Sequence, residues 1–232
     1  MPADLVLPSR DDPFVAASSE GVGGPAGRRV RPGAGWWTPL RVLLALTLLT
    51  ASLGYLSKDY CRERAWPRGG GVEYVHVCYS DLGHLYLERG LAAGRVPYLD
   101  RVPGEVPYVE YPVLTGALMW LTAQPARGAG DQAAQVRRYV DLNAALLAIF
   151  ALVVVAATAR TAGRRPWDAA LVALAPTLAL AGTINWDLFA VALTATAGLA
   201  WARRRPVLAG VLLGLGTAAK LYPVLLLGAL LV

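Results

Sequence analysis

Uncharged apolar stretches alternate with short polar segments along most of this chain. A helix needs about 20 apolar residues to cross a bilayer, and an arginine or lysine at its end can extend a shorter stretch by reaching toward the headgroups. Tryptophan, which favours the membrane–water interface, stands at several edges of these stretches. The pattern predicts an all-α, polytopic transmembrane helix bundle. Its apolar stretches are Val42–Ser57, Leu142–Ala159, Ala169–Trp186, Leu188–Ala202, Pro206–Ala219 and Leu221–Val232.

Positive charge predicts how these spans are oriented. The dense basic clusters in short connections are Arg28/Arg29/Arg31, Arg160/Arg164/Arg165 and Arg203/Arg204/Arg205. Because such clusters stay in the cytoplasm, an even number of crossings should separate the first two. A seventh apolar stretch, Val113–Ala123, has only 11 residues, so we expect it to lie at the outer interface or to re-enter. The Lys58–Tyr139 segment, the Asn185–Asp187 turn and Lys220 then all fall on the outer face.

Composition supports a membrane protein over a soluble one. Hydrophobic residues make up 56% of the 232 residues and charged residues only 16%, whereas soluble domains carry about 25% charged residues. The net charge of +6 comes from clusters that read as topology signals, so no nucleic-acid partner is expected. No phosphate-binding glycine loop appears, which argues against an ATP-driven pump and against a transferase fed by a soluble nucleotide sugar.

Two domains are expected from the same pattern. Residues 1–35 are rich in Pro, Gly, Ala, Ser and Arg and should form a disordered cytoplasmic N-terminus. Residues 36–232 should form the transmembrane domain, with 58–139 as its long first outer loop. The chain stops inside an apolar run, which favours the interpretation that it is truncated at the C-terminus.

Within the outer loop, residues 80–94 read as a short amphipathic helix at the membrane surface. Ser80 is a good N-cap and Gly94 a plausible stop. One face collects Leu82, Leu85, Tyr86 and Arg89, and another collects Asp81, His84 and Glu88.

The residues alone leave the acidic face of this helix open to several interpretations. Asp81 suits the first turn of a helix through the helix dipole, and on periodicity alone this structural role is favoured. His84 and Glu88 have the spacing of a surface pair. A metal site of Asp81, His84 and Glu88 has compatible spacing, but a three-residue match is weak. No metal ligand or cofactor is assigned, and a requirement for a divalent metal stays open.

Other polar positions also have two interpretations. Four prolines make residues 97–112 a rigid loop that would hold the carboxylates of Asp100 and Glu110 in place. Asp187 either completes a polar turn between two apolar stretches or serves a site. Lys220 either snorkels toward the headgroups or binds a lipid phosphate at the outer interface.

Cysteine usage points to an oxidising compartment. Cys61 and Cys78 are the only cysteines, and both fall in the predicted outer loop, where disulfides persist. We expect them to form a disulfide; the alternative is a pair of unrelated free thiols.

Several short motifs resemble glycosyltransferase family 87. They are Ser80-Asp81-Leu82 with Tyr86, the run Gly90–Asp100, Glu110-Tyr111-Pro112, and Lys220-Leu221-Tyr222-Pro223. Members of that family are polyprenyl-phosphate-mannose-dependent mannosyltransferase-like proteins of the actinobacterial cell envelope, with the GT-C fold. The resemblance runs from about residue 40 to the end. Related proteins often carry a second proline where this chain has Val113, which bears on the loop conformation more than on the chemistry.

The resemblance implies a membrane mannosyltransferase whose acidic residue near the start of the first outer loop is catalytic. Asp81 matches that position and would act as general base while the sugar leaves its lipid phosphate with inversion. Lys220, with Arg89 and Arg95 as alternatives, would bind the donor phosphate. The implied partners are a polyprenyl-phosphate sugar donor, a lipid- or glycan-linked acceptor and the bilayer. Supporting roles fall to His84, Tyr86, Asp100, Glu110, Tyr111 and Asp187.

Two other function classes stay open. A secondary transporter would place ionisable residues at the bilayer midplane between broken helices, whereas here the stretches are almost free of them. A non-catalytic membrane scaffold would not need Asp81, so loss of activity on Asp81→Ala with normal insertion would exclude it.

Overall fold

The computed structural model describes residues 13, 35–66, 71–100, 109–163 and 165–230, and within these ranges the regular structure is entirely helical. The segment expected to be disordered, 1–35, lies outside the described residues apart from Pro13 and Gly35. The main helices are α2 (Pro39–Leu56), α3 (Asp59–Glu63), α4 (Val72–Val75), α5 (Asp81–Glu88), α6 (Val113–Ala126), α7 (Gln132–Thr161), α8 (Ala170–Ala173), α9 (Pro176–Ala181), α10 (Asp187–Ala202), α11 (Pro206–Ala219) and α12 (Leu226–Leu230).

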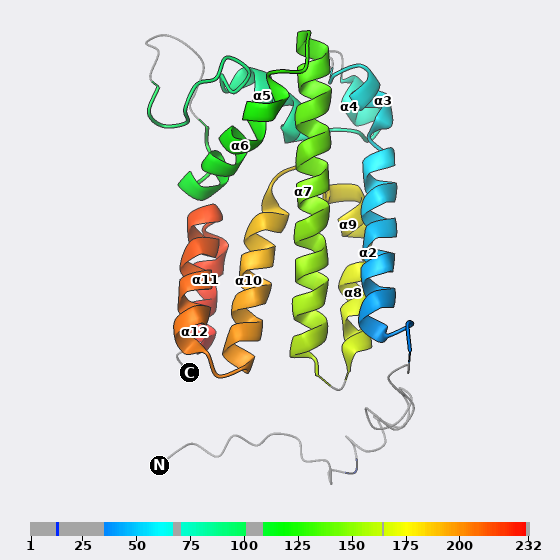
Figure 1. Ribbon diagram of the computed structural model, residues 1–232, viewed down its shortest axis with the longest axis vertical. Helices are drawn as coiled ribbons and strands as arrows, with labels where there is room; N and C mark the ends of the chain where they lie inside the picture. Colours follow the sequence, from blue (N-terminus) through cyan, green and yellow to red (C-terminus); the bar gives the residue numbers. More distant parts are fainter. Residues whose placement is uncertain (1–12, 14–34, 67–70, 101–108, 164, 231–232) are drawn as a thin grey trace.

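Figure 1 shows an elongated bundle with α7 at its centre. Helix α2 packs against α7 on one side, and α10 packs between α7 and α11 on the other. Helices α2 and α7 are long and apolar enough to cross a membrane, with 18 and 30 residues. The apolar helices α10 and α11 are shorter. Helices suit a lipid environment, because the backbone groups between their first and last turns are paired within the helix.

The predicted span Ala169–Trp186 is not one continuous helix. It is divided into a 3₁₀ turn at Pro166–Ala169 and the short helices α8 and α9. Pro176 causes the interruption, since proline lacks an N–H and forces the preceding residue out of helical conformation. Ala175 is accordingly extended, with ψ 125°.

The predicted stretch Leu221–Val232 also has a break at its start. Lys220 is extended (φ −156°, ψ 144°) and ends α11, and a 3₁₀ turn at Tyr222–Leu225 then leads into α12. In Figure 1 α12 runs back beside α11. The turn leaves Lys220 at the end of the bundle where α11 meets α6.

Helix α7 begins earlier than the predicted stretch Leu142–Ala159. Asp131 caps it by accepting a 2.7 Å hydrogen bond from the backbone N–H of Ala134. The segment predicted as outer loop therefore includes the first turns of α7, which pack against α5 and α6. Helix α6, which contains the stretch Val113–Ala123, lies at the upper end of the bundle above α11 (Figure 1).

Helix α5 is shorter than its sequence prediction. Its side-chain cap is Ser80 as expected, but it ends at Glu88, and Gly90 adopts the left-handed conformation (φ 73°) that stops it. Gly94 is also left-handed but lies in the following turn. The predicted apolar face is buried, with Leu82 and Tyr86 fully enclosed. The helix therefore belongs to the core and turns only its acidic face outward.

A disulfide ties the small helices together. Cys61 and Cys78 are bonded, with 5.9 Å between their Cα atoms, and both are completely buried. The indole N–H of Trp66 donates to the carbonyl of Cys78 at 3.1 Å. The ring of Trp66 lies so close to Gly83 that a Cβ there would come within 2.7 Å of it. This packing fixes α5 against α3.

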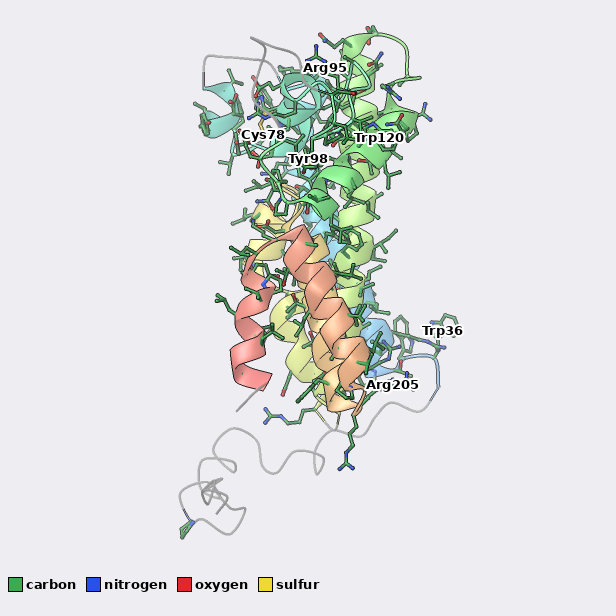
Figure 2. The ribbon with its side chains drawn as sticks, turned by 90° about the vertical axis from the view of Figure 1, so that its left-hand side faces the viewer. Trp36, Cys78, Arg95, Tyr98, Trp120 and Arg205 are labelled. Atoms are coloured by element: carbon green, nitrogen blue, oxygen red, sulfur yellow. A yellow bond between two sulfur atoms is a disulfide. The ribbon has the colours of Figure 1, made fainter. Side chains whose placement is uncertain are left out.

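The two ends of the bundle differ in character. Figure 2 shows Trp36 and Arg205 at one end and Cys78, Arg95 and Tyr98 at the other. The ends of α7 and α10 that lead into the predicted cytoplasmic arginine clusters lie together, as the charge pattern requires (Figure 1).

Candidate active site

The upper end of the molecule contains a cavity of about 740 Å³. Its walls come from α4, α5, the residues before α6, and the end of α11. Carboxylates and cations both line it, together with tyrosine rings. A hollow that gathers this many polar groups at one end of an apolar bundle is the default candidate for a functional site.

Asp81 lines this cavity, and hydrogen bonds fix the chain at the start of its helix. Its N–H donates to the carbonyl of Ile184 at 2.8 Å, and the hydroxyl of Ser80 donates to the carbonyl of Thr183 at 2.7 Å. These bonds join the start of α5 to the connection between α9 and α10. The carboxylate position is thus set by two segments about 100 residues apart.

Two phenols bind the Asp81 carboxylate. The hydroxyl of Tyr79 donates to Oδ1 at 2.6 Å, and the hydroxyl of Tyr111 donates to Oδ2 at 2.8 Å. The hydrogen bond to Asp81 and partial burial raise the pKa of Tyr79 well above its usual value. Burial first, and then the bond to Asp81, does the same for the pKa of Tyr111. Both phenols therefore stay protonated donors at any physiological pH.

Tyr111 is supported from two directions. Its ring meets the buried Trp186 edge-on, with centroids 5.5 Å apart, and the Trp186 indole donates to Asn143 at 2.7 Å. The hydroxyl of Tyr98 donates to the carbonyl of Tyr111 at 2.6 Å. Gly116 provides the room for that hydroxyl, since a Cβ there would lie 2.0 Å from it. The second phenol on Asp81 is thus a positioned group.

Two cations reach the cavity, each paired with a carboxylate. Lys220 pairs with Asp187, and both side chains stay partly exposed. Arg89 donates to Glu110 at 2.7 Å and lies 3.7 Å from Glu88. Its Nε is buried without a hydrogen-bond partner among the described residues. The cavity therefore offers an entering anion two cations, each of which would be shared with the carboxylate that it already contacts.

The structure brings together most of the site residues predicted from the sequence. The cavity is lined by Asp81, His84, Arg89, Glu110, Tyr111 and Lys220. Asp187 joins them through its ion pair with Lys220.

Three predicted site residues lie elsewhere. Tyr86 is fully buried in the core, where its ring stacks on Tyr139 with centroids 4.5 Å apart. Asp100 accepts a 2.7 Å hydrogen bond from the N–H of Val96 and so stabilises its own turn. Arg95 is not among the residues that line the cavity; it packs against Gly90.

Sequence reasoning missed Tyr79, Tyr74 and Glu73, which also line the cavity. Tyr79 carries a local signal, because it stands two positions before Asp81 and next to its cap. Glu73 carries none, since α4 reaches the site only through the fold around the disulfide.

A metal centre has no ligand set in the part of the chain that the structure describes. There, no three His, Cys, Asp or Glu side chains are placed to hold one ion. The alternative site of Asp81, His84 and Glu88 is therefore not formed. The hydroxyls of Tyr79 and Tyr111 bind the Asp81 carboxylate.

The comparisons with known proteins support a single assignment. The family model described as glycosyltransferase family 87 matches residues 108–232, just over half of the chain. No curated protein and no solved structure matches significantly. The matched part supplies Glu110, Tyr111 and Lys220 to the cavity, and the part before it supplies Asp81.

Proposed function

Because the chain belongs to glycosyltransferase family 87, we propose that it moves mannose from a polyprenyl-phosphate donor to a hydroxyl of a lipid- or glycan-linked acceptor. Family membership implies membrane glycosyltransferase activity, and the apolar helices α2 and α7 agree with a membrane location. The donor, the sugar and the side of the membrane are the parts that the proposal adds. A GT-C-like fold is part of the same proposal.

One observation carries the proposal: the Asp81 carboxylate, fixed by two phenols, shares a cavity with Lys220. Transfer with inversion needs a base for the incoming hydroxyl and positive charge for the departing phosphate. Asp81 would accept the proton of the acceptor hydroxyl while the oxygen of that hydroxyl forms a bond to the anomeric carbon. The bond from that carbon to the phosphate oxygen breaks, and the phosphate leaves with the electron pair toward Lys220.

The proposal includes an orientation. The end of the bundle that carries the cavity would face the outside of the cell, and the end that carries Arg205 would face the cytoplasm with the N-terminus (Figure 2). The protein would then be multi-pass. The Cys61–Cys78 disulfide supports this orientation, because disulfides persist in oxidising compartments.

The cavity's position favours a transferase over a transporter or a scaffold. A transporter site lies at the bilayer midplane between discontinuous helices, whereas this cavity is lined by α4, α5, the residues before α6 and Lys220, which follows the last residue of α11. A scaffold would not need a carboxylate held by two hydroxyls in a hollow of this size.

The test compares Asp81→Asn with Asp59→Asn in the full chain, reconstituted in lipid nanodiscs. Asp59 is half exposed, outside the cavity, and provides the matched control. With radiolabelled polyprenyl-phosphate mannose and a membrane acceptor fraction, Asp81→Asn should abolish transfer and keep donor binding. Normal transfer by Asp81→Asn would exclude Asp81 as the base, and absence of both transfer and donor binding in the unaltered protein would contradict the donor assignment.

A further inference from the structure

The α4 side of the cavity contains buried polar atoms that nothing in the described chain satisfies. Glu73 is only 8% exposed, and its Oε2 has no hydrogen-bond partner among the described residues. The Nε2 of His84 is also buried without a hydrogen-bond partner among the described residues, and it lies 3.7 Å from Oε1 of Glu73. Both side chains line the cavity. A buried polar group without a partner is destabilising, so this pair is suited to a ligand that brings hydrogen bonds.

Aromatic rings form the wall next to this pair. Tyr74 stacks on Tyr79 with centroids 5.5 Å apart, and Tyr79 stacks on His84 at 5.8 Å. Tyr74 is largely exposed, so its ring stands at the mouth of the cavity. The ligand that fits here offers hydroxyls on its edge and an apolar C–H face, which is the chemistry of a pyranose ring. A metal ion fits poorly, since the described residues place no third ligand beside Glu73 and His84.

The geometry of the transfer indicates whether the donor sugar or the acceptor binds at the α4 side of the cavity. An inverting displacement is in line, so the incoming hydroxyl and the departing phosphate lie on opposite sides of the anomeric carbon. Helix α4 and the upper end of α11 lie on opposite sides of the bundle (Figure 1). If Lys220 receives the phosphate, the acceptor enters from the α4 side.

We infer that Glu73 and His84, with Tyr74 and Tyr79 as the stacking wall, form the subsite that binds the acceptor saccharide. This inference rests on the proposed function, because it takes the Lys220 side as the donor's. The Glu73 carboxylate would accept hydrogen bonds from two neighbouring sugar hydroxyls, and Nε2 of His84 would bind a third. Asp81, in the same cavity, would then face the hydroxyl that reacts.

The test measures binding without turnover. The full chain in nanodiscs is titrated with a panel of octyl glycosides (mannoside, glucoside and galactoside) and, separately, with polyprenyl-phosphate mannose. Glu73→Gln keeps the side-chain volume and removes the charge, and His84→Phe keeps the ring and removes Nε2. Glu63→Gln is the matched control, because Glu63 is 66% exposed and outside the cavity.

At least one octyl glycoside should bind to the unaltered protein. Its affinity should fall about tenfold in Glu73→Gln and in His84→Phe, the effect of losing one charge-assisted hydrogen bond. Glu63→Gln and the donor affinity of every variant should stay unchanged. Equal glycoside affinity in all variants, loss of donor affinity alone, or no glycoside binding to the unaltered protein would each overturn it. Failure of the proposed function looks different, because donor binding and transfer would be absent while the glycoside results stood.

Discussion

The hydroxyl of Tyr111 donates a 2.8 Å hydrogen bond to Oδ2 of Asp81, across 30 positions of sequence. Tyr111 lies within the part of the chain that matches the family model, and Asp81 lies before it. This bond therefore connects the proposed base to the matched region, so that the segments before and within that region contribute to the same candidate site. The bond from Tyr79 on the other carboxylate oxygen leaves the Asp81 side chain little freedom to rotate.

Tyr111→Phe should lower kcat about tenfold, the effect of one lost hydrogen bond to a charged group, and should change the donor KM little. The substitution keeps the ring against Trp186 and removes only the hydroxyl that fixes Asp81. Steady-state transfer with polyprenyl-phosphate mannose measures both constants. Tyr60→Phe, outside the cavity, is the control. An unchanged kcat in Tyr111→Phe would show that the second phenol does not position the base.

Gly116→Ala should reduce both activity and thermal stability. A Cβ at this position would lie 2.0 Å from the hydroxyl of Tyr98, which binds the carbonyl of Tyr111. Either Tyr98 or α6 must move, and Tyr111 moves with it. Gly198→Ala is the matched control, since nothing lies within 4 Å of a Cβ there and alanine favours a helix by about 1 kcal/mol. Melting temperature and transfer rate are measured on both variants. Equal values for Gly116→Ala and Gly198→Ala would contradict the packing role of Gly116.

Local signals predicted the parts of the site that depend on local structure. Ser80 caps α5, and Asp81 lies on the polar face of the same helix. Both features are predictable because capping and helical periodicity act within one turn. The sequence predicts that Gly94 ends this helix, whereas Gly90 ends it in the structure. Both glycines carry the same signal, and only packing chooses between them. Pro176 breaks a predicted span, because hydropathy identifies the apolar stretch but carries no information on where proline interrupts the helix.

The other parts of the site depend on contacts between distant segments. Glu73 reaches the cavity because the disulfide and Trp66 fold α4 back toward α5. Lys220 reaches it because α11 ends below α6, where Thr115 donates a 2.7 Å bond to the carbonyl of Ala219. No periodicity in a single sequence encodes such contacts. Tyr86, predicted beside the site from its motif, packs into the core instead.

Removal of the disulfide should destabilise the upper end of the molecule. The bond spans 17 positions, and closing a loop of that size contributes about 3 kcal/mol to the free energy of unfolding. Replacement of both Cys61 and Cys78 by serine should therefore lower the unfolding midpoint, and a reducing agent should do the same to the unaltered protein. Thiol titration of the denatured chain should find no free thiol before reduction and two after it. Equal counts in the two samples would exclude the bond in the membrane.

The proposed orientation predicts which engineered cysteines are accessible from outside intact cells. Val75 is 77% exposed at the cavity end, and Thr161 is exposed at the opposite end of α7. Val75→Cys should react with a membrane-impermeant maleimide in intact cells, whereas Thr161→Cys should react only after permeabilisation. The native cysteines are bonded to each other and should remain unlabelled in both intact and permeabilised cells. The reverse pattern would invert the topology and place the cavity in the cytoplasm.

Lys220→Met should raise the donor KM about tenfold or more and leave the acceptor KM unchanged, because the attraction between a cation and a phosphate is stronger at a half-dry interface than in water. Lys220 is held by Asp187 at the cavity wall, and its side chain is 37% exposed, so it can reach an incoming anion. Lys220→Arg keeps the charge and should retain most of the donor affinity. The control Arg64→Met removes a cation that is 47% exposed and outside the cavity.

Asp187→Asn separates phosphate binding from a merely structural role for the same lysine. If Lys220 only anchors the end of α11 through its ion pair, Asp187→Asn and Lys220→Met should lower the melting temperature alike and leave equilibrium donor binding intact. If Lys220 binds the phosphate, Asp187→Asn frees the cation from its carboxylate, so donor binding should tighten or hold while Lys220→Met weakens it. Normal donor affinity and rate in Lys220→Met would remove Lys220 from the site and leave Arg89 as the cation for the phosphate.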